Sequence, residues 1–255
     1  RNRPPRRGGV AVTMTLTSPI AAGLDRVRRS IDEAAAAAGR DPSEITLIAV
    51  SKAFPAEAIQ QAVAAGQRNF GENRVQELVS KHATIGPGPS GHNVGRLQRT
   101  KVKQVLSTGA VIHSVDRLEL AQEIDSRAVH PVQVLVEVNV TGEPQKGGVE
   151  PDQLNGLVEA ALEMPNLEVV GLMTMARKTG DPELARPYFA ELARLRDQLA
   201  QGYSPMIHHL SMGMSQDYRV AVQQGATMVR VGEAIFGPRT PPQTLRAEQM
   251  GESER

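Results

Sequence analysis

The chain has 255 residues, a formal net charge of +1, 40% hydrophobic residues, 3% aromatic residues and no cysteine or tryptophan. This composition excludes disulfide and thiolate chemistry, and it predicts a globular fold with an aliphatic core. No apolar run has the length of a membrane-spanning helix and no secretory h-region is present, so we expect a cytoplasmic protein without a membrane partner.

Both ends of the chain are polar and rich in Arg or Pro. Residues 1–13 hold four arginines and no acidic residue, and without them the formal net charge falls from +1 to −3. We therefore expect a disordered basic tail at 1–13, a folded body at 14–238 and a flexible tail at 239–255. Because the body is mildly acidic, we do not expect a nucleic-acid partner.

The predicted elements alternate in type along the chain. The first is a helix over Pro19–Ala38, which Ser18 can cap and Gly39 can end. Short β-branched runs follow, and they begin near Ile45, Arg68, Gly91, Val111, Val132, Leu167, Met206 and Thr227. Helical stretches separate these runs, at Ala56–Ala65, Arg74–Lys81, Gln98–Leu106, Arg117–Ala128, Pro151–Leu162, Pro182–Ala200 and Gln216–Gln224.

Strand–helix alternation predicts a parallel sheet with right-handed crossovers. Eight runs match a single (β/α)8 TIM barrel with an extra N-terminal helix. A doubly wound open sheet is the structural alternative, and it would place a glycine-rich phosphate loop after the first strand. That position reads SKAFPAEA, without glycine, so the pattern favours the barrel.

Lys52 directly follows the apolar run at residues 47–51, where the end of a barrel strand meets the active face. An amine that is partly desolvated at a barrel mouth has a lowered pKa and can attack a carbonyl carbon. The alternative is a lysine that extends to solvent or pairs with a carboxylate. After the second run, Glu72 and Asn73 reach the same mouth, although Asn73 could equally cap the following helix.

The last two strand ends carry residues suited to phosphate. Ser211, Gly213 and Ser215 offer hydroxyls and backbone N–H groups before the helix that starts near Gln216, and Gly232 permits close approach of an anion. The loops after strands seven and eight are common phosphate sites in such barrels. The alternative is that Ser215 caps a helix and Gly232 ends a strand.

Arg230 lies in the last strand between two valines and is expected to face the barrel interior. A buried guanidinium needs an acceptor, which could be Glu137 in a structural pair or an aromatic ring nitrogen of a ligand. The spacing of His113, His208 and His209 is not that of a metal site, so we expect no metal.

Motifs across residues 47 to 237 resemble a known family. In chain order they are AVSK, FGENRVQE, GRLQRTK, HSVD, VEVNVTGEPQKGGV, GLMTM, LSMGMSQDY and MVRVGEAIFG. The chain is similar to the pyridoxal phosphate homeostasis proteins, often called the YggS or PROSC family. The resemblance implies the barrel of the alanine racemase N-terminal domain (fold type III) with pyridoxal 5'-phosphate (PLP) as cofactor. It also implies a role in vitamin B6 homeostasis without robust enzymatic activity.

The resemblance also assigns roles by motif. It implies a Schiff base between PLP and Lys52, with Asn73 near the ring face and Lys146 as an accessory lysine for cofactor transfer. Arg230 would meet the pyridine nitrogen and keep it unprotonated, which weakens the ring as an electron sink. The residues that would hold the phosphate, largely through backbone N–H groups, are Ser211, Met212, Gly232 and Glu233.

Two positions depart from the family pattern. The third strand in relatives usually reads like WHFIG, whereas residues 91–95 read GHNVG. We therefore expect the wall of the pocket beside this strand to be altered. Relatives often carry a second lysine two residues after the first, where this chain has Phe54.

We therefore expect a monomeric protein that buffers PLP or delivers it to PLP-dependent apo-enzymes. The main alternative is a PLP-dependent racemase or decarboxylase. Such enzymes need a second acid or base from an additional β domain, which we do not expect here because the chain ends soon after its last strand. A barrel enzyme that acts on a sugar phosphate, with an aldolase-type Lys52, is a third reading that does not explain the motifs.

Overall fold

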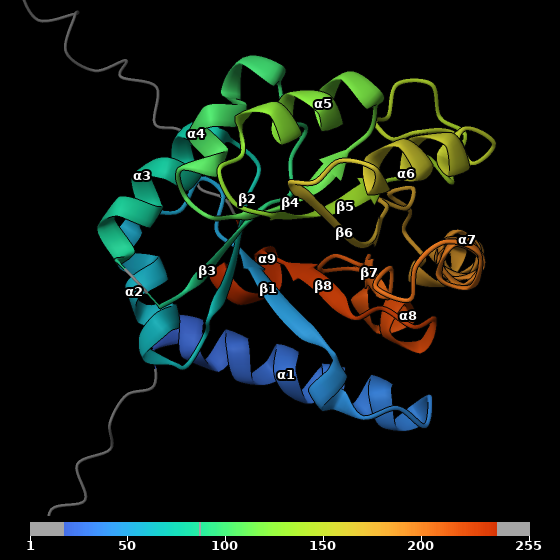
Figure 1. Ribbon diagram of the computed structural model, residues 1–255. Coiled ribbons are helices and arrows are strands. Elements are labelled where there is room, and N and C mark those ends of the chain that lie inside the picture. The colour runs from blue at the N-terminus through green and yellow to red at the C-terminus, as the bar shows by residue number, and fades with distance from the viewer. Residues whose placement is uncertain (1–17, 87, 239–255) are drawn as a thin grey trace, which may run out of the picture.

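The computed structural model describes residues 18–86 and 88–238 (Figure 1). The tails predicted at 1–13 and 239–255 lie outside the described residues. Among the described residues, no helix has the length and apolar character that crossing a membrane requires.

Eight parallel strands of the described chain close into a barrel, and each strand pairs with its neighbours in sequence, β1 pairing with β8. The strands are β1 (Thr46–Val50), β2 (Asn69–Glu72), β3 (Ser90–Asn93), β4 (Val111–Val115), β5 (Val132–Glu137), β6 (Leu167–Met173), β7 (His209–Ser211) and β8 (Met228–Val231). The predicted (β/α)8 barrel is therefore confirmed.

Helices surround the barrel, with the extra helix α1 lying across one side (Figure 1). The α-helices of the described residues are α1 (Pro19–Ala37), α2 (Ala56–Ala64), α3 (Val75–Ile85), α4 (Val102–Leu106), α5 (Leu118–Arg127), α6 (Leu154–Leu162), α7 (Arg186–Gly202), α8 (Tyr218–Gln223) and α9 (Glu233–Phe236). Short 3-10 turns are η1 (Pro42–Glu44), η2 (Arg99–Lys101) and η3 (Pro182–Ala185). Ser18 caps α1 as predicted, because its hydroxyl accepts a hydrogen bond from Ala21 N at 3.3 Å.

Helix starts differ most from the sequence expectation. The stretches predicted from Gln98 and Pro182 begin as 3-10 turns, and the stretch predicted from Pro151 becomes helical only at Leu154. Strand β7 also begins at His209, three residues after the predicted start. Local turn hydrogen bonds compete with the α-helix in such first turns, and hydrophobic periodicity does not detect them.

The core has two layers because side chains alternate across each strand. A small cluster fills the barrel interior: Ile48, Leu135, Val170, Met173 and Met228. A larger aliphatic layer lies between the strands and the helices. Because the interior cluster is small, the rest of the barrel interior is available for polar side chains.

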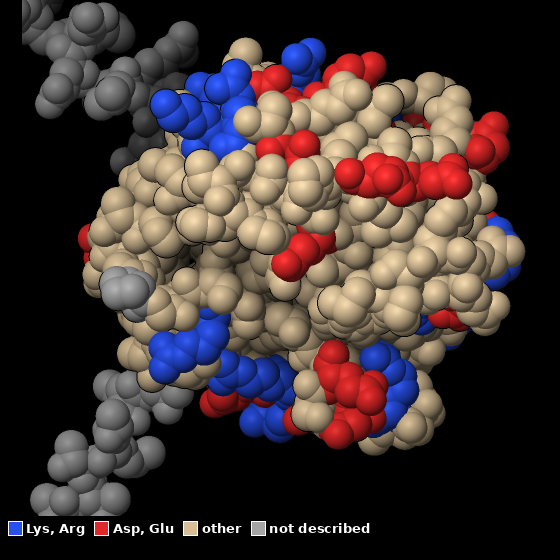
Figure 2. All heavy atoms as spheres, viewed as in Figure 1, with Lys and Arg blue, Asp and Glu red and all other residues tan. Residues whose placement is uncertain are grey.

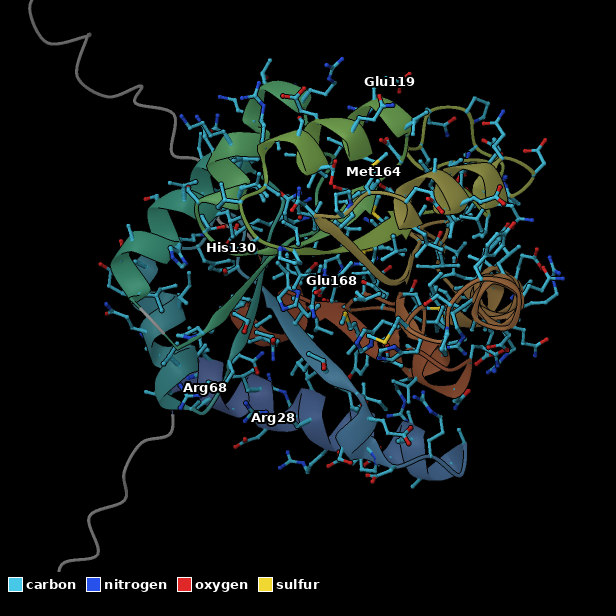
Figure 3. The ribbon with its side chains drawn as sticks, in the orientation of Figure 1. Arg28, Arg68, Glu119, His130, Met164 and Glu168 are labelled. Atoms are coloured by element: carbon cyan, nitrogen blue, oxygen red, sulfur yellow. The ribbon has the colours of Figure 1, made fainter. Side chains whose placement is uncertain are left out.

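The end of the barrel where the strands begin carries its own hollow of about 460 Å³, which Arg28, Arg68 and Asn69 line. Figure 3 labels both arginines, Arg28 on α1 and Arg68 just before β2. On the face drawn in Figure 2, positive side chains gather over α1 and α4, and acidic side chains gather toward α6. The strand ends, at the opposite side of the barrel, carry the residues that the sequence singled out.

Candidate functional site

A cleft of about 260 Å³ opens where the strands end. Six residues selected from the sequence line it: Lys52, Asn73, Ser215, Arg230, Gly232 and Glu233. Arg230 points up from within β8, and the others lie one to four residues beyond the end of a strand. Val50 and Val94 supply an apolar wall. The cleft therefore combines amine, guanidinium, amide and backbone N–H donors on a partly apolar surface.

Lys52 is half-buried, two residues beyond the end of β1. The next residue, Ala53, has φ of 65°, a left-handed conformation that costs a residue with a Cβ about 1 kcal/mol. Its N–H donates to Glu77 Oε2 at 2.9 Å. Phe54 stacks on Phe236 of α9 with ring centroids 5.1 Å apart, so an aromatic contact takes the place of the second lysine of relatives. The turn that carries Lys52 is thus held on both sides.

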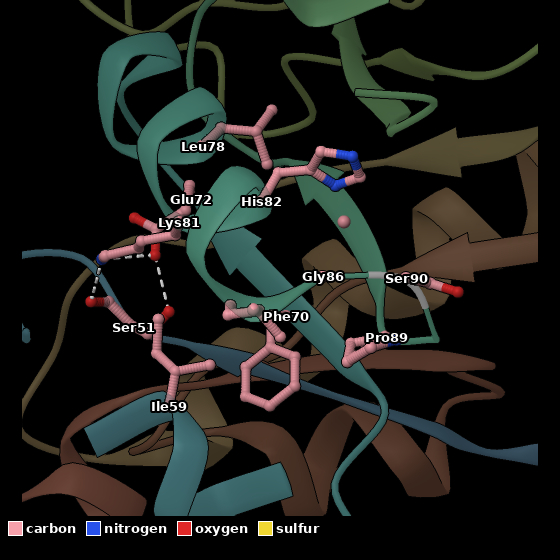
Figure 4. Close-up of a pocket in the computed structure, with 12 residues that line it drawn as sticks. Ser51, Ile59, Phe70, Glu72, Leu78, Lys81, His82, Gly86, Pro89 and Ser90 are labelled. Carbon is pink, nitrogen blue, oxygen red and sulfur yellow. Dashed lines mark hydrogen bonds and ion pairs between the residues drawn. The ribbon is translucent and has the colours of Figure 1, made fainter. Parts of the chain in front are cut away.

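A buried ion pair supports the same turn from below (Figure 4). Lys81 Nζ donates to Ser51 O at 2.7 Å and to Glu72 Oε1 at 2.6 Å, and Ser51 Oγ donates to the same Glu72 oxygen at 2.6 Å. Burial raises the pKa of Glu72, and the bonds from Lys81 and Ser51 partly oppose that rise. The expectation that Glu72 faces the mouth is therefore wrong. Neighbouring Gly71 faces the barrel interior, so Glu72 must point outward to α3.

Asn73 lines the cleft and does not cap the helix that follows. Helix α3 starts at Val75 with Arg74 in the capping position and no side-chain cap, so the capping interpretation of Asn73 is wrong. The backbone of Asn73 passes very close to Gly95: a Cβ built on Gly95 would lie 2.2 Å from Asn73 O. This contact positions Asn73 at the cleft.

We expect Gly95→Ala to lower the free energy of unfolding by about 2 kcal/mol, because backbone atoms on both sides resist displacement. Gly156→Ala is the matched control, since nothing lies within 4 Å of its added Cβ in helix α6. That substitution should stabilise the protein by about 0.5–1 kcal/mol through helix propensity. Urea unfolding of both variants tests the contact, and wild-type stability of Gly95→Ala would contradict it.

Arg230 is buried and is held by neutral acceptors. Its Nη1 donates to Ser211 Oγ at 2.6 Å, and its Nη2 donates to Thr174 O at 2.8 Å. Glu137 acts on it through its charge, but the two side chains make no ion pair within 4.0 Å in the described chain, so the alternative of a structural Arg230–Glu137 pair is wrong. Burial lowers the pKa of Arg230 to about 10, which leaves it charged at neutral pH.

Ser211 and Met212 lie behind the cleft. The hydroxyl of Ser211 bonds Arg230 inside the barrel, and the side chain is fully buried. The backbone N–H of Met212 donates to Met228 O at 3.1 Å, and its side chain is also fully buried. Both residues therefore support the wall, and neither lines the cleft. Their predicted contact with phosphate stays a prediction.

Ser215 offers a better-placed hydroxyl. Its Oγ accepts hydrogen bonds from Gly232 N at 3.3 Å and Ala234 N at 3.4 Å, and the residue lines the cleft beside Glu233. Two backbone N–H groups thus converge on one oxygen. An oxygen of an anionic ligand can accept hydrogen bonds from the same donors.

Lys146 lies at the edge of the site. Its Nζ pairs with Glu143 and donates to Met175 O at 3.3 Å. The loop that begins at Met175 lines the cleft and adds residues that the sequence analysis did not select: Met175, Arg177, Lys178, Thr179 and Pro182. The polar run after GLMTM is the only signal for this loop, and its conformation depends on tertiary contacts.

The atypical third strand does not alter the cleft directly. Gly91 and Asn93 face outward, and Gly91 lines a separate cavity of about 30 Å³ behind the strand, with Phe70 and Leu78 (Figure 4). Asn93 Nδ2 donates to Gly95 O at 3.0 Å. The strand contributes Val94 to the cleft, so the smaller side chains leave a gap toward α3 rather than a wider site.

Glu137 is a buried carboxyl whose pKa is raised to about 7, mainly by burial and then by Asp116, with Arg230 and Arg96 opposing the rise. Its folded-state pKa lies above the unfolded value, so ionisation costs stability as pH rises toward 7. We expect Glu137→Gln to stabilise the protein at pH 8 by about 2 kcal/mol and to have little effect near pH 5. Urea unfolding across this pH range measures the difference, and a pH-independent difference would contradict the assignment.

Comparisons with known proteins show the family to which this chain belongs. A family model described as the alanine racemase N-terminal domain matches residues 23–240. The pyridoxal phosphate homeostasis protein of Aquifex aeolicus is 46% identical over 220 residues, covering 85% of this chain and 96% of that protein. This chain belongs to the pyridoxal phosphate homeostasis protein family. The member from Escherichia coli K12 is 39% identical over 231 residues, covering 86% and 97%.

Solved structures are also similar to this chain. PipY of Synechococcus elongatus PCC7942, described with PLP bound, has a TM-score of 0.75 and 35% identity and covers 86% of this chain and 100% of that chain. Alanine racemase of Clostridium difficile 630 has a TM-score of 0.69 at 16% identity and shares the fold alone. The family resemblance inferred from the motifs is thus confirmed.

Proposed function

We propose that this protein binds PLP in the cleft at the strand ends and buffers it or delivers it to PLP-dependent apo-enzymes in the cytoplasm. The observation that carries the proposal is the arrangement of Lys52 at a strand end, the buried Arg230 and two converging backbone N–H groups around a single cleft. An aldehyde, a ring nitrogen and a phosphate are the three groups of PLP that such donors suit.

The donor set fits the cofactor. Lys52 Nζ, as the unprotonated amine, would bond to the aldehyde carbon of PLP with release of one water. Gly232 and Ala234 would donate to the phosphate where they now donate to Ser215. Arg230 would donate to the ring nitrogen. Bound PLP would supply an electrophilic aldehyde and an electron-accepting ring.

The protein's own residues work against turnover. Arg230 remains charged at neutral pH and carries no acceptor, so it keeps the ring nitrogen unprotonated and weakens the ring as an electron sink. None of the described residues that line the cleft is a tyrosine, and Tyr218 lies in the core. We therefore propose that racemase or decarboxylase activity is negligible, with turnover of amino acids below about 1 s⁻¹.

The proposal is tested by mixing the purified protein with PLP, removing unbound ligand by gel filtration, and recording the absorbance and the phosphate content. We expect about one PLP per chain with the visible band of an imine. Pyridoxine 5'-phosphate, which lacks the aldehyde, should bind without that band. A protein that retains no PLP would contradict the proposal, and rapid amino-acid turnover would favour the racemase or decarboxylase alternative.

A further inference from the structure

Five polar side chains form a continuous hydrogen-bonded column through the barrel interior. Arg230 Nη1 donates to Ser211 Oγ at 2.6 Å, and that oxygen lies 2.8 Å from His113 Nδ1. His113 Nε2 lies 3.0 Å from His92 Nδ1, and His92 Nε2 lies 3.1 Å from Asn69 Oδ1. The column therefore connects the cleft with the opposite end of the barrel, where β2 begins.

Water cannot replace the inner bonds, because the column is buried from Arg230 to His92 and is partly exposed only at Asn69. The exposed fraction is 0% for His113 and Ser211, 3% for His92 and 4% for Arg230. Burial lowers the pKa of His92 to about 4, and burial followed by the charges of His92, Arg230 and His209 holds the pKa of His113 well below its usual range. Both imidazoles are therefore neutral at physiological pH, and each carries one N–H.

Only one direction of hydrogen bonding satisfies every member. Asn69 Oδ1 can only accept, so His92 carries its proton on Nε2 and its Nδ1 accepts from His113 Nε2. His113 Nδ1 is then an acceptor, and the Ser211 hydroxyl donates to it. Because the hydroxyl proton is committed to His113, the lone pairs of Ser211 face the guanidinium of Arg230, which only donates.

We infer that His113, acting through Ser211, is a positioning residue that fixes the Arg230 guanidinium toward the ring nitrogen of the bound cofactor. This inference rests on the proposed function. Ser211 Oγ and Thr174 O hold the two terminal nitrogens of Arg230, so the plane of the guanidinium is set at two points. Without His113 the Ser211 hydroxyl can rotate and present its proton to Arg230, which removes one of these points. Ser211 thereby belongs to the support of Arg230, which accounts for its burial behind the cleft.

The test compares Ser211→Ala and His113→Leu with the wild-type chain, using PLP and its 1-deaza analogue, in which C–H replaces the ring nitrogen. His209→Leu is the matched control, because His209 is a half-buried barrel histidine that bonds Thr227 outside the column. We expect each column variant to bind PLP about tenfold more weakly, the effect of one hydrogen bond to a charged group. Affinity for the deaza analogue should stay within about twofold, and the control should bind both ligands like the wild type.

The double variant should bind PLP about as weakly as either single variant, since both residues act through Arg230. Equal losses for PLP and the deaza analogue, or unchanged PLP affinity with a lowered melting temperature, would show a merely structural role and overturn the inference. Should the wild-type protein retain no PLP, the proposed function itself fails.

A second measurement needs no variant to fold and no ligand. Nitrogen-15 NMR of the histidine rings in the wild-type protein reports their tautomers directly. We expect His92 and His113 to be neutral with the proton on Nε2 at pH 7. A proton on Nδ1 of His113 would reverse the column and overturn the inference, whether or not PLP binds.

Discussion

Lys52→Ala should abolish the imine absorbance that PLP gives with this protein and weaken retention of the ligand by at least about 100-fold. Lys52 carries the amine that we propose to bond the aldehyde covalently, and its turn is held by Ala53, Phe54 and the ion pair beneath it. Absorbance after gel filtration, together with equilibrium dialysis, measures both effects.

Lys178→Ala is the matched control, because Lys178 is a second lysine that lines the same cleft. It should keep the imine band and lose only a modest part of the affinity, through reduced attraction of the phosphate. Loss of the band in Lys178→Ala with retention in Lys52→Ala would move the covalent role to the other lysine.

Lys81→Met should destabilise the fold by about 3 kcal/mol, because it leaves the buried carboxylate of Glu72 without its cation. The side chains of Lys81 and Glu72 are 11% and 2% exposed, and they contact at 2.6 Å. The second oxygen of Glu72 already has no hydrogen-bond partner, so few other bonds would stabilise the carboxylate once Lys81 is removed. Urea unfolding at pH 7 measures the loss.

Two further variants isolate the cause. Lys103→Met removes an exposed lysine from α4 and should change stability by less than about 0.5 kcal/mol. The double variant Lys81→Met with Glu72→Gln should recover part of the loss, since the unpaired charge is gone. No recovery in the double variant would show that the methylenes of Lys81, rather than the ion pair, supply the stability.

The barrel was predictable because its signal is repeated: eight apolar runs alternate with amphipathic stretches. The strand ends also placed Lys52, Asn73 and Gly232 at one face, since parallel strands share an end. The direction in which individual side chains point was harder to predict from the sequence. From their positions in the chain, Glu72 and Ser211 were both expected at the mouth. Strand alternation turns the side chain of Glu72 outward to Lys81, and the bond to Arg230 holds the side chain of Ser211 inside the barrel.

Long-range partners explain the other gaps. Lys81 bonds Ser51, Thr174 bonds Arg230 and His113 bonds Ser211. The partners in each pair lie far apart in the sequence, and no spacing rule predicts that they meet. The loop after β6 contributes Arg177 and Lys178 to the cleft because it folds back over the strand ends, a conformation set by contacts such as Arg177 Nη2 with Thr141 O at 3.2 Å. Sequence patterns report burial and periodicity, and they do not report which buried polar groups meet.

The most direct test of PLP binding at Lys52 is to reduce the wild-type protein with borohydride in the presence of PLP, digest it, and map the modified peptide by mass spectrometry. Reduction fixes the bond between the amine and the aldehyde carbon, so the label marks the lysine that formed it. We expect a single pyridoxyl phosphate group on Lys52. A label confined to another lysine, or spread over exposed lysines without Lys52, would contradict it.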